Sequence, residues 1–161
     1  MWGSWIDNKW ISKVLDRCAE FQDNEYIFQS KNPQRFFNFE FGGGKSRVRQ
    51  INKFMLGTTI ETDNYPEGFQ TKAPPISERC MAMRHLLWRK TFITIEPIMK
   101  FNLHALIRMI GEIKPEFVTI GADSKGHNLE EPSWKEVQAL VYELTKFTEI
   151  RQKTNLERLR K

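Results

Sequence analysis

Apolar residues recur along the chain in two alternating patterns. Short runs rich in β-branched and aromatic residues predict five strands, which begin near residues 26, 54, 91, 117 and 147. Amphipathic stretches predict helices over residues 7–21, 34–39, 77–88 and 103–113 and from residue 133 onward. This alternation favours a parallel sheet whose strands are joined by right-handed crossovers.

Polar residues mark where several of these helices begin. Asp7, Asn102 and Ser133 precede helical patterns, and Ser133 with Glu136 forms a capping-box pattern. We expect Asn155 to cap a short terminal helix. The side chains expected to face the core from the first and third helices are Trp10, Ile11, Val14, Leu15, Cys18, Phe21, Met81, Leu86 and Leu87.

Five strands are too few for a closed β/α barrel, which needs eight. The sheet is expected to curl openly, unless the chain lacks the first strands of a larger barrel or a partner supplies the rest. We predict one α/β domain over residues 1–161. It is a partial barrel of about five parallel strands with helices outside and a basic C-terminal segment, residues 151–161.

Carboxylates follow two of the predicted strands. Glu96 ends the third strand and Asp123 follows the fourth. Loops after parallel strands gather at one end of the sheet, so we expect both carboxylates at that end. Residues 62–76 form a long loop in the same kind of position, where binding loops are common. Lys125 and His127, beyond Asp123, fit either an anion site or a plain surface loop.

The overall composition is that of an ordinary globular chain. Of its 161 residues, 40% are hydrophobic and 28% are charged. No apolar run is long enough to span a membrane, and the N-terminus lacks the features of a signal peptide. We interpret the protein as cytoplasmic and expect no membrane partner.

The net charge of +5 is concentrated in two segments. These hold Lys45, Arg47, Arg49, Lys53, Arg151, Lys153, Arg158, Arg160 and Lys161. Concentrated cations are suited to phosphate contacts, so we consider binding of nucleic acid or of a partner. The alternative is a solvated surface with cations that favour a helix C-terminus.

The cysteines and the glycine run predict no chemistry. Cys18 and Cys80 are far apart and lie among apolar residues, so we expect two buried thiols, no disulfide and no metal site. The Gly42–Ser46 loop is not a phosphate-binding loop, because Phe39 stands where that motif needs glycine. We expect a tight turn or a mobile insertion there.

Several long segments resemble the C-terminal part of the phage Gp37/Gp68-type family, a radical-SAM-related group. The resemblance runs from about Trp2 to Leu159, and its segments are IFQSKNPQRF, GTTIETDNYP, APPISERCMAMRHL, TFITIEPIMKFN, IKPEFVTIGADSKGHNL and FTEIRQKTNLERL. It implies a partial barrel. Full-length relatives carry an N-terminal CxxxCxxC motif for an iron–sulfur cluster that binds S-adenosylmethionine. This chain has no such motif, so we expect no cofactor and no catalysis by the chain alone.

The resemblance also implies that certain strand-end side chains point into the barrel mouth. The matching positions are Lys31, Thr59, Glu61, Glu96 and Asp123. They are expected to form a relic cofactor or substrate cleft, or else to cap helices and satisfy loop backbone groups.

Two main functional hypotheses follow. The first is a non-catalytic phage or mobile-element protein that binds a host or phage protein or a nucleic acid; an inhibitor of a host defence nuclease fits the same features. The second is the C-terminal part of a split or truncated radical-SAM enzyme whose iron–sulfur half is supplied elsewhere. A third reading is a homo-oligomer that pairs through the open sheet edge.

Overall fold

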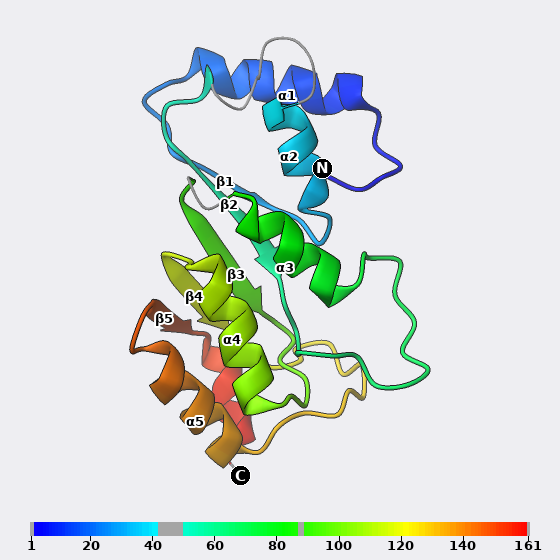
Figure 1. Ribbon diagram of the computed structural model, residues 1–161, viewed down its shortest axis with the longest axis vertical. Helices are drawn as coiled ribbons and strands as arrows, with labels where there is room; N and C mark the ends of the chain where they lie inside the picture. The colour runs from blue at the N-terminus through cyan, green and yellow to red at the C-terminus, as the bar shows by residue number, and fades with distance from the viewer. Residues whose placement is uncertain (1, 42–49, 87–88, 161) are drawn as a thin grey trace.

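The computed structural model describes residues 2–41, 50–86 and 89–160, and their chain forms an α/β fold with a five-stranded, all-parallel sheet (Figure 1). The elements follow in the order α1 (Asn8–Glu20), β1 (Tyr26–Gln29), α2 (Gln34–Phe41), β2 (Phe54–Thr59), α3 (Ile76–Arg84), β3 (Thr91–Ile95), α4 (Leu103–Ile113), β4 (Phe117–Ile120), α5 (Trp134–Leu144), β5 (Glu149–Gln152) and the 3₁₀-helix η2 (Thr154–Leu159). The strands lie in their sequence order, so each new strand adds to the same growing edge. The predicted strand–helix alternation is confirmed.

One face of the sheet carries the hydrophobic core. The register places alternate residues of the three central strands, β2, β3 and β4, on this face. The apolar side chains there are fully buried: Leu56, Ile93, Ile95, Val118 and Ile120. Figure 1 shows α3, α4 and α5 as one layer against this sheet. Burial of each such side chain stabilises the fold by about 1.5–3 kcal/mol, so this face fixes the register.

The opposite face of the sheet carries a row of aromatic and polar side chains. The register aligns Gly57 with Phe92, Phe92 with Phe117, and Phe117 with Glu149. The Phe92 and Phe117 rings stack with centroids 5.1 Å apart. A Cβ atom on Gly57 would lie 2.3 Å from the Phe92 ring, so a larger residue there would force that ring to move.

The predicted helix starts are confirmed at three places. The Asp7 side chain accepts a hydrogen bond from the Lys9 amide (2.7 Å), and Asn102 accepts one from the Ala105 amide (3.0 Å). Ser133 and Glu136 form the complete capping box of α5. Cap and apolar spacing agree at these sites, which explains why the sequence locates them.

Other boundaries differ from the predictions. Helix α3 begins at Ile76 and ends at Arg84, whereas the sequence suggested 77–88; residues 87 and 88 lie outside the described ranges. Strand β5 begins at Glu149 rather than near Phe147, because the Phe147 amide still bonds to the last turn of α5. Asn155 does not cap the terminal helix; its amide donates to Glu96 and to the Ala122 carbonyl.

Four side chains expected in the core are exposed instead. They are Trp10, Val14, Phe21 and Met81. In α1 the buried side holds Ile11, Leu15 and Cys18, and the apolar stripe is wider than this side. No helix within the described part of the chain is both long enough and apolar enough to cross a membrane.

Candidate functional site

All five strand-end positions predicted from the sequence lie at the carboxyl edge of the sheet. Lys31 follows β1, Thr59 ends β2, Glu61 follows it, Glu96 follows β3, and Asp123 follows β4. Their polar atoms do not converge on one point. They divide into three separate networks, around Glu61, around Glu96 and around Asp123.

The Glu61 network is the most deeply buried of the three. Arg79, on α3, has a fully buried side chain and donates from Nη1 to Glu61 Oε2 over 2.9 Å. The same guanidinium donates to the Thr59 and Pro74 carbonyls, at 3.0 and 2.7 Å. Arg79 thereby ties the end of β2 to the loop that enters α3.

Tyr65 closes this network from the long loop after β2. Its hydroxyl donates to Glu61 Oε2 (2.9 Å) and accepts a hydrogen bond from Arg79 Nη2 (2.9 Å). Its ring stacks on Phe69, with centroids 4.4 Å apart. The stack and the hydroxyl together hold part of the loop against the strand ends.

The network shifts the pKa values of its members. Burial raises the pKa of Glu61, but the Lys31 ammonium and the Arg79 guanidinium outweigh it and hold this pKa below its ordinary value. Glu61 is therefore an ionised carboxylate at neutral pH. Burial and the adjacent Glu61 charge raise the pKa of Tyr65 to about 12, so Tyr65 stays a hydrogen-bond donor.

The second carboxylate oxygen of Glu61, Oε1, is in a different state from Oε2. It is buried, and its partner is not the Arg79–Tyr65 network but the ammonium of Lys31, which contacts it in an ion pair. This contact is the main cause that lowers the pKa of Glu61. The Lys31 side chain is 47% exposed, whereas that of Glu61 is 3% exposed, so Lys31 covers the carboxylate from the solvent side.

A cavity of about 370 Å³ opens beside this carboxylate, and we call it the Glu61 cleft. Its lining comes from the loops after β1, β2, β3 and β4: Lys31, Glu61, Tyr65, Phe69, Gln70, Thr71, Pro97, Met99, His127 and Leu129. The cleft therefore combines an ionised carboxylate (Glu61), a half-exposed cation (Lys31) and an apolar wall. It lies at the edge where ligands bind in parallel sheets.

Glu96 belongs to the second network. Lys153 Nζ lies 2.5 Å from its Oε2, and the Asn155 amide donates to its Oε1 over 3.2 Å. Gly121 of the next loop passes so closely that a Cβ atom there would lie 2.7 Å from Glu96 Oε1. These contacts attach η2 to the sheet, so Glu96 has a structural role in this geometry.

Asp123 organises the loop after β4. Its carboxylate accepts hydrogen bonds from the Lys125 amide (3.0 Å), the His127 amide (2.5 Å) and His127 Nδ1 (2.8 Å). These bonds, led by the one from the Lys125 amide, lower the pKa of Asp123 to about 2. The loop places His127 on the wall of the Glu61 cleft, while the Lys125 side chain is exposed.

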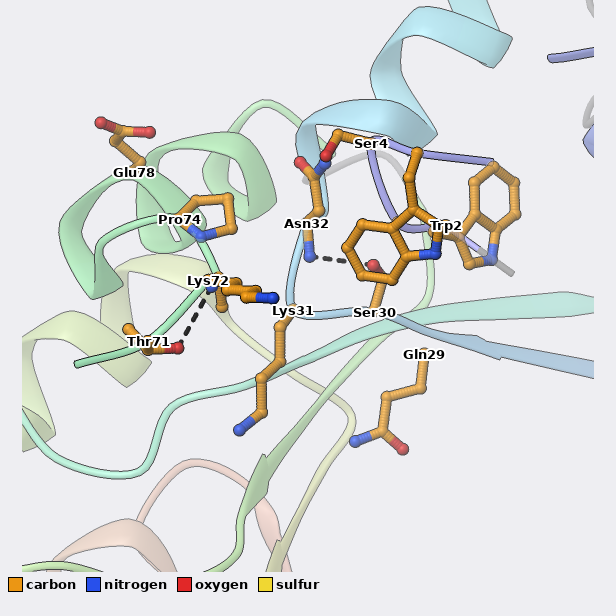
Figure 2. A pocket seen from close by; sticks show the side chains of 13 residues that line it. Trp2, Ser4, Gln29, Ser30, Lys31, Asn32, Thr71, Lys72, Pro74 and Glu78 are labelled. Carbon is orange, nitrogen blue, oxygen red and sulfur yellow. Dashed lines mark hydrogen bonds between the residues drawn. The ribbon is translucent and has the colours of Figure 1, made fainter. Parts of the chain in front are cut away.

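A second cavity, of about 630 Å³, lies near the end of β1. Figure 2 shows Trp2 and Ser4 on one side of it and Thr71, Lys72 and Pro74 on the other. Lys31 lines both this cavity and the Glu61 cleft.

The basic residues of the C-terminal segment that the structure describes lie in ion pairs, whereas Lys161 lies outside the described residues. Arg151 pairs with Glu149, Lys153 with Glu96, Arg158 with Glu131, and Arg160 with Glu157. Arg151 also lies 3.6 Å from the Phe117 ring centroid, and Arg160 lies 4.8 Å from that of Trp134. Of the other basic segment, Lys53 is exposed, and Lys45, Arg47 and Arg49 lie outside the described residues, as does the Gly42–Ser46 loop.

Both cysteines are buried free thiols, as predicted. Burial raises the pKa of Cys80 to about 11, which keeps it an unreactive thiol. Within residues 2–41, 50–86 and 89–160, no three His, Cys, Asp or Glu side chains are grouped so as to hold a metal ion.

The sequence reading missed Arg79 and Tyr65. A signal for Arg79 was present, because the apolar neighbours Ile76, Ala82 and Met83 place position 79 on the buried side of α3. An arginine on a buried helix face requires a buried acid or carbonyl partner. Nothing in the local pattern marked Tyr65, whose role depends on the path of the loop.

Comparisons with known proteins add no relatives to this description: no family model, no curated protein and no solved structure matches the chain.

Proposed function

We propose that the protein is a binding protein on a partial β/α barrel of the radical-SAM type, and that it acts by holding a protein partner rather than by its own catalysis. The observation that carries the proposal is a concentration of exposed apolar side chains at the start of the chain. Of eight large exposed apolar side chains among the described residues, five come from this part: Trp5, Trp10, Val14, Phe21 and Ile27.

These five side chains, the N-terminal apolar residues, are strongly exposed. Trp5 is 77% exposed, Trp10 67% and Ile27 60%. Trp10 and Val14 share one side of α1 by their spacing, and Phe21 follows the last turn of that helix. Figure 1 shows α1 apart from the layer of α3, α4 and α5. Exposed apolar residues gathered in one part of a chain favour a protein contact, where tryptophan often contributes most.

Strand β1 adds an open sheet edge to the same part of the chain. The Tyr26 amide donates to the carbonyl of Lys53, just before β2, and the Ser30 amide donates to the Gly57 carbonyl within β2. Alternate residues of a parallel strand bond to opposite sides, so the backbone groups of Ile27 and Gln29 point away from β2. No described strand lies beyond β1. Such an edge accepts an added strand from a partner.

A protein fits these observations better than a nucleic acid does. The cations of residues 151–160 are held in ion pairs with neighbouring acids, which reduces the charge available to phosphates. A phage-encoded inhibitor of a host defence nuclease is one protein binder of this kind. A second copy of this chain is another occupant that the open edge admits.

A second candidate function is the C-terminal part of a split or truncated radical-SAM enzyme. The Glu61 cleft favours it, because it places an ionised carboxylate in a cavity at the carboxyl ends of the strands. This reading requires another polypeptide that carries the iron–sulfur cluster. Co-purification of an iron–sulfur subunit would support it.

The test captures partners of the tagged protein from host lysate after nuclease treatment. The Trp10→Ser, Ile27→Thr double variant removes two N-terminal apolar residues, and Tyr142→Ser removes an exposed aromatic residue on α5 as a matched control. We expect a stoichiometric protein that the double variant loses and the control keeps. Equal capture by all three forms, or capture that nuclease abolishes, would contradict the proposal.

A further inference from the structure

The two oxygens of the Glu61 carboxylate have partners of different kinds. Oε2 receives hydrogen bonds from Arg79 and from Tyr65, each at 2.9 Å. Oε1 is buried, and its described partner is the ammonium of Lys31, whose side chain is 47% exposed. A buried carboxylate oxygen needs a donor, so a ligand ammonium that takes the place of Lys31 can donate to Oε1.

Lys31 covers this oxygen without belonging to the buried network. Its side chain is 47% exposed, and it follows the short edge strand β1, whereas Arg79 is fixed in α3 by bonds to two carbonyls. Arg79 alone balances the charge of Glu61, so the withdrawal of Lys31 into water leaves the pair neutral. A ligand cation can replace the Lys31 ammonium with no change in the charge of the cluster.

The other walls of the Glu61 cleft indicate what kind of group the ligand carries beside its cation. Pro97, Met99 and Leu129 give apolar surface, and the Tyr65–Phe69 stack gives an aromatic surface. A cavity of about 370 Å³ suits a small organic molecule rather than a polypeptide. Flat rings pack well on aromatic and thioether side chains.

We propose that the Glu61 cleft binds a small organic cation, a primary amine joined to an apolar ring, whose ammonium displaces Lys31 and donates to Glu61 Oε1. The ring then lies between Tyr65, Met99 and Leu129. Lys31 acts as an internal substitute for the ligand ammonium while the cleft is empty. This site is independent of the N-terminal apolar residues, so either proposal can fail without the other.

The competing interpretation is an anion site, in which Lys31 and His127 bind a carboxylate and Glu61 only positions Lys31. The two interpretations predict opposite effects of removing Lys31. Loss of its ammonium opens Oε1 to a ligand amine, but it destroys an anion site.

The test titrates benzylamine, and separately benzoate, into the full chain and its variants by calorimetry. We expect Lys31→Ala to bind benzylamine about tenfold more tightly than the unaltered protein, and Glu61→Gln in that background to lose binding. Benzyl alcohol is the matched uncharged probe, and it is expected to bind weakly to every form.

A second variant keeps the test decisive if Glu61→Gln does not fold. Leu129→Trp fills the cleft from a half-buried loop position and leaves the Glu61 network intact. In the Lys31→Ala background it is expected to abolish benzylamine binding without lowering the melting temperature. Benzylamine binding unchanged by Lys31→Ala and Leu129→Trp, or benzoate binding that Lys31→Ala removes, would overturn the proposal.

Discussion

Arg79 Nη1 lies 2.9 Å from Glu61 Oε2, and both side chains are almost completely removed from solvent. This pair joins α3 to the end of β2 at the edge where the loops of the cleft begin. A buried pair gives little net stability against an apolar substitute of equal shape. The loss of Arg79 alone, however, leaves the buried Glu61 carboxylate with the half-exposed Lys31 as its remaining cation.

Removal of Arg79 is therefore expected to be costly. Arg79→Met should lower the free energy of unfolding by about 3–5 kcal/mol, as measured by chemical denaturation. The matched control is Arg84→Met in the same helix, which breaks only the exposed pair with Glu112 and should cost less than about 1 kcal/mol. Similar losses for both variants would show that the Arg79 pair is not a buried structural link.

The depressed pKa of Glu61 predicts a dependence of stability on acid. A carboxyl whose folded pKa is lowered contributes stability above its unfolded pKa of about 4.3. That stability is lost as the pH falls through the lower folded pKa. Between neutral pH and the pH of acid unfolding, the free energy of unfolding should decrease less in Glu61→Gln than in the unaltered protein. Parallel curves for both proteins would contradict the assignment.

Tyr65 gives a prediction at the other end of the pH scale. Its pKa is raised to about 12, so its contribution to stability persists below the ordinary tyrosine value and disappears as the pH rises through the folded pKa. Ultraviolet titration of the folded protein should show a tyrosine that ionises at about pH 12. Tyr65→Phe should remove that step, and its persistence in the variant would contradict the assignment.

Gly121 tests the contact between the Glu96 and Asp123 loops. A methyl group at Gly121 would meet Glu96 Oε1 at 2.7 Å, so Gly121→Ala should destabilise the fold by about 1–3 kcal/mol. Gly111→Ala is the control. Gly111 lies within α4, and a Cβ atom there would make an ordinary contact with the Phe147 ring at 3.8 Å. That variant should gain about 0.5–1 kcal/mol from helix propensity. Stabilisation by both substitutions would contradict the close approach at Gly121.

The sequence located the parallel strands because each is a short β-rich run between amphipathic helices. It located Asp7, Asn102 and Ser133 as caps because a cap is recognised within one turn. It placed Glu96 and Asp123 at one edge, because parallel strands share their carboxyl end, and the family resemblance added Lys31 and Glu61 to that edge. It did not show that they form separate networks, since the pairing of Glu61 with Arg79 and of Glu96 with Lys153 depends on the paths of long loops.

The hydrophobic pattern of the sequence predicted poorly which apolar side chains of the first helix are exposed. Trp10, Val14 and Phe21 fit a helical stripe, but the stripe is wider than the surface that α1 buries. The same excess is what supports a partner-binding function. Burial is a property of the neighbours in space, so spacing along one helix does not determine it.

The central claim is that a protein partner occupies the N-terminal apolar residues and the open edge of β1. Amide hydrogen exchange of the protein, free and bound to its captured partner, tests it most directly. The Ile27 and Gln29 amides should exchange fast in the free protein and at least about tenfold more slowly in the complex, together with slower exchange in α1. Protection confined to residues 151–160 or to the loops of the Glu61 cleft, with β1 unchanged, would contradict the claim.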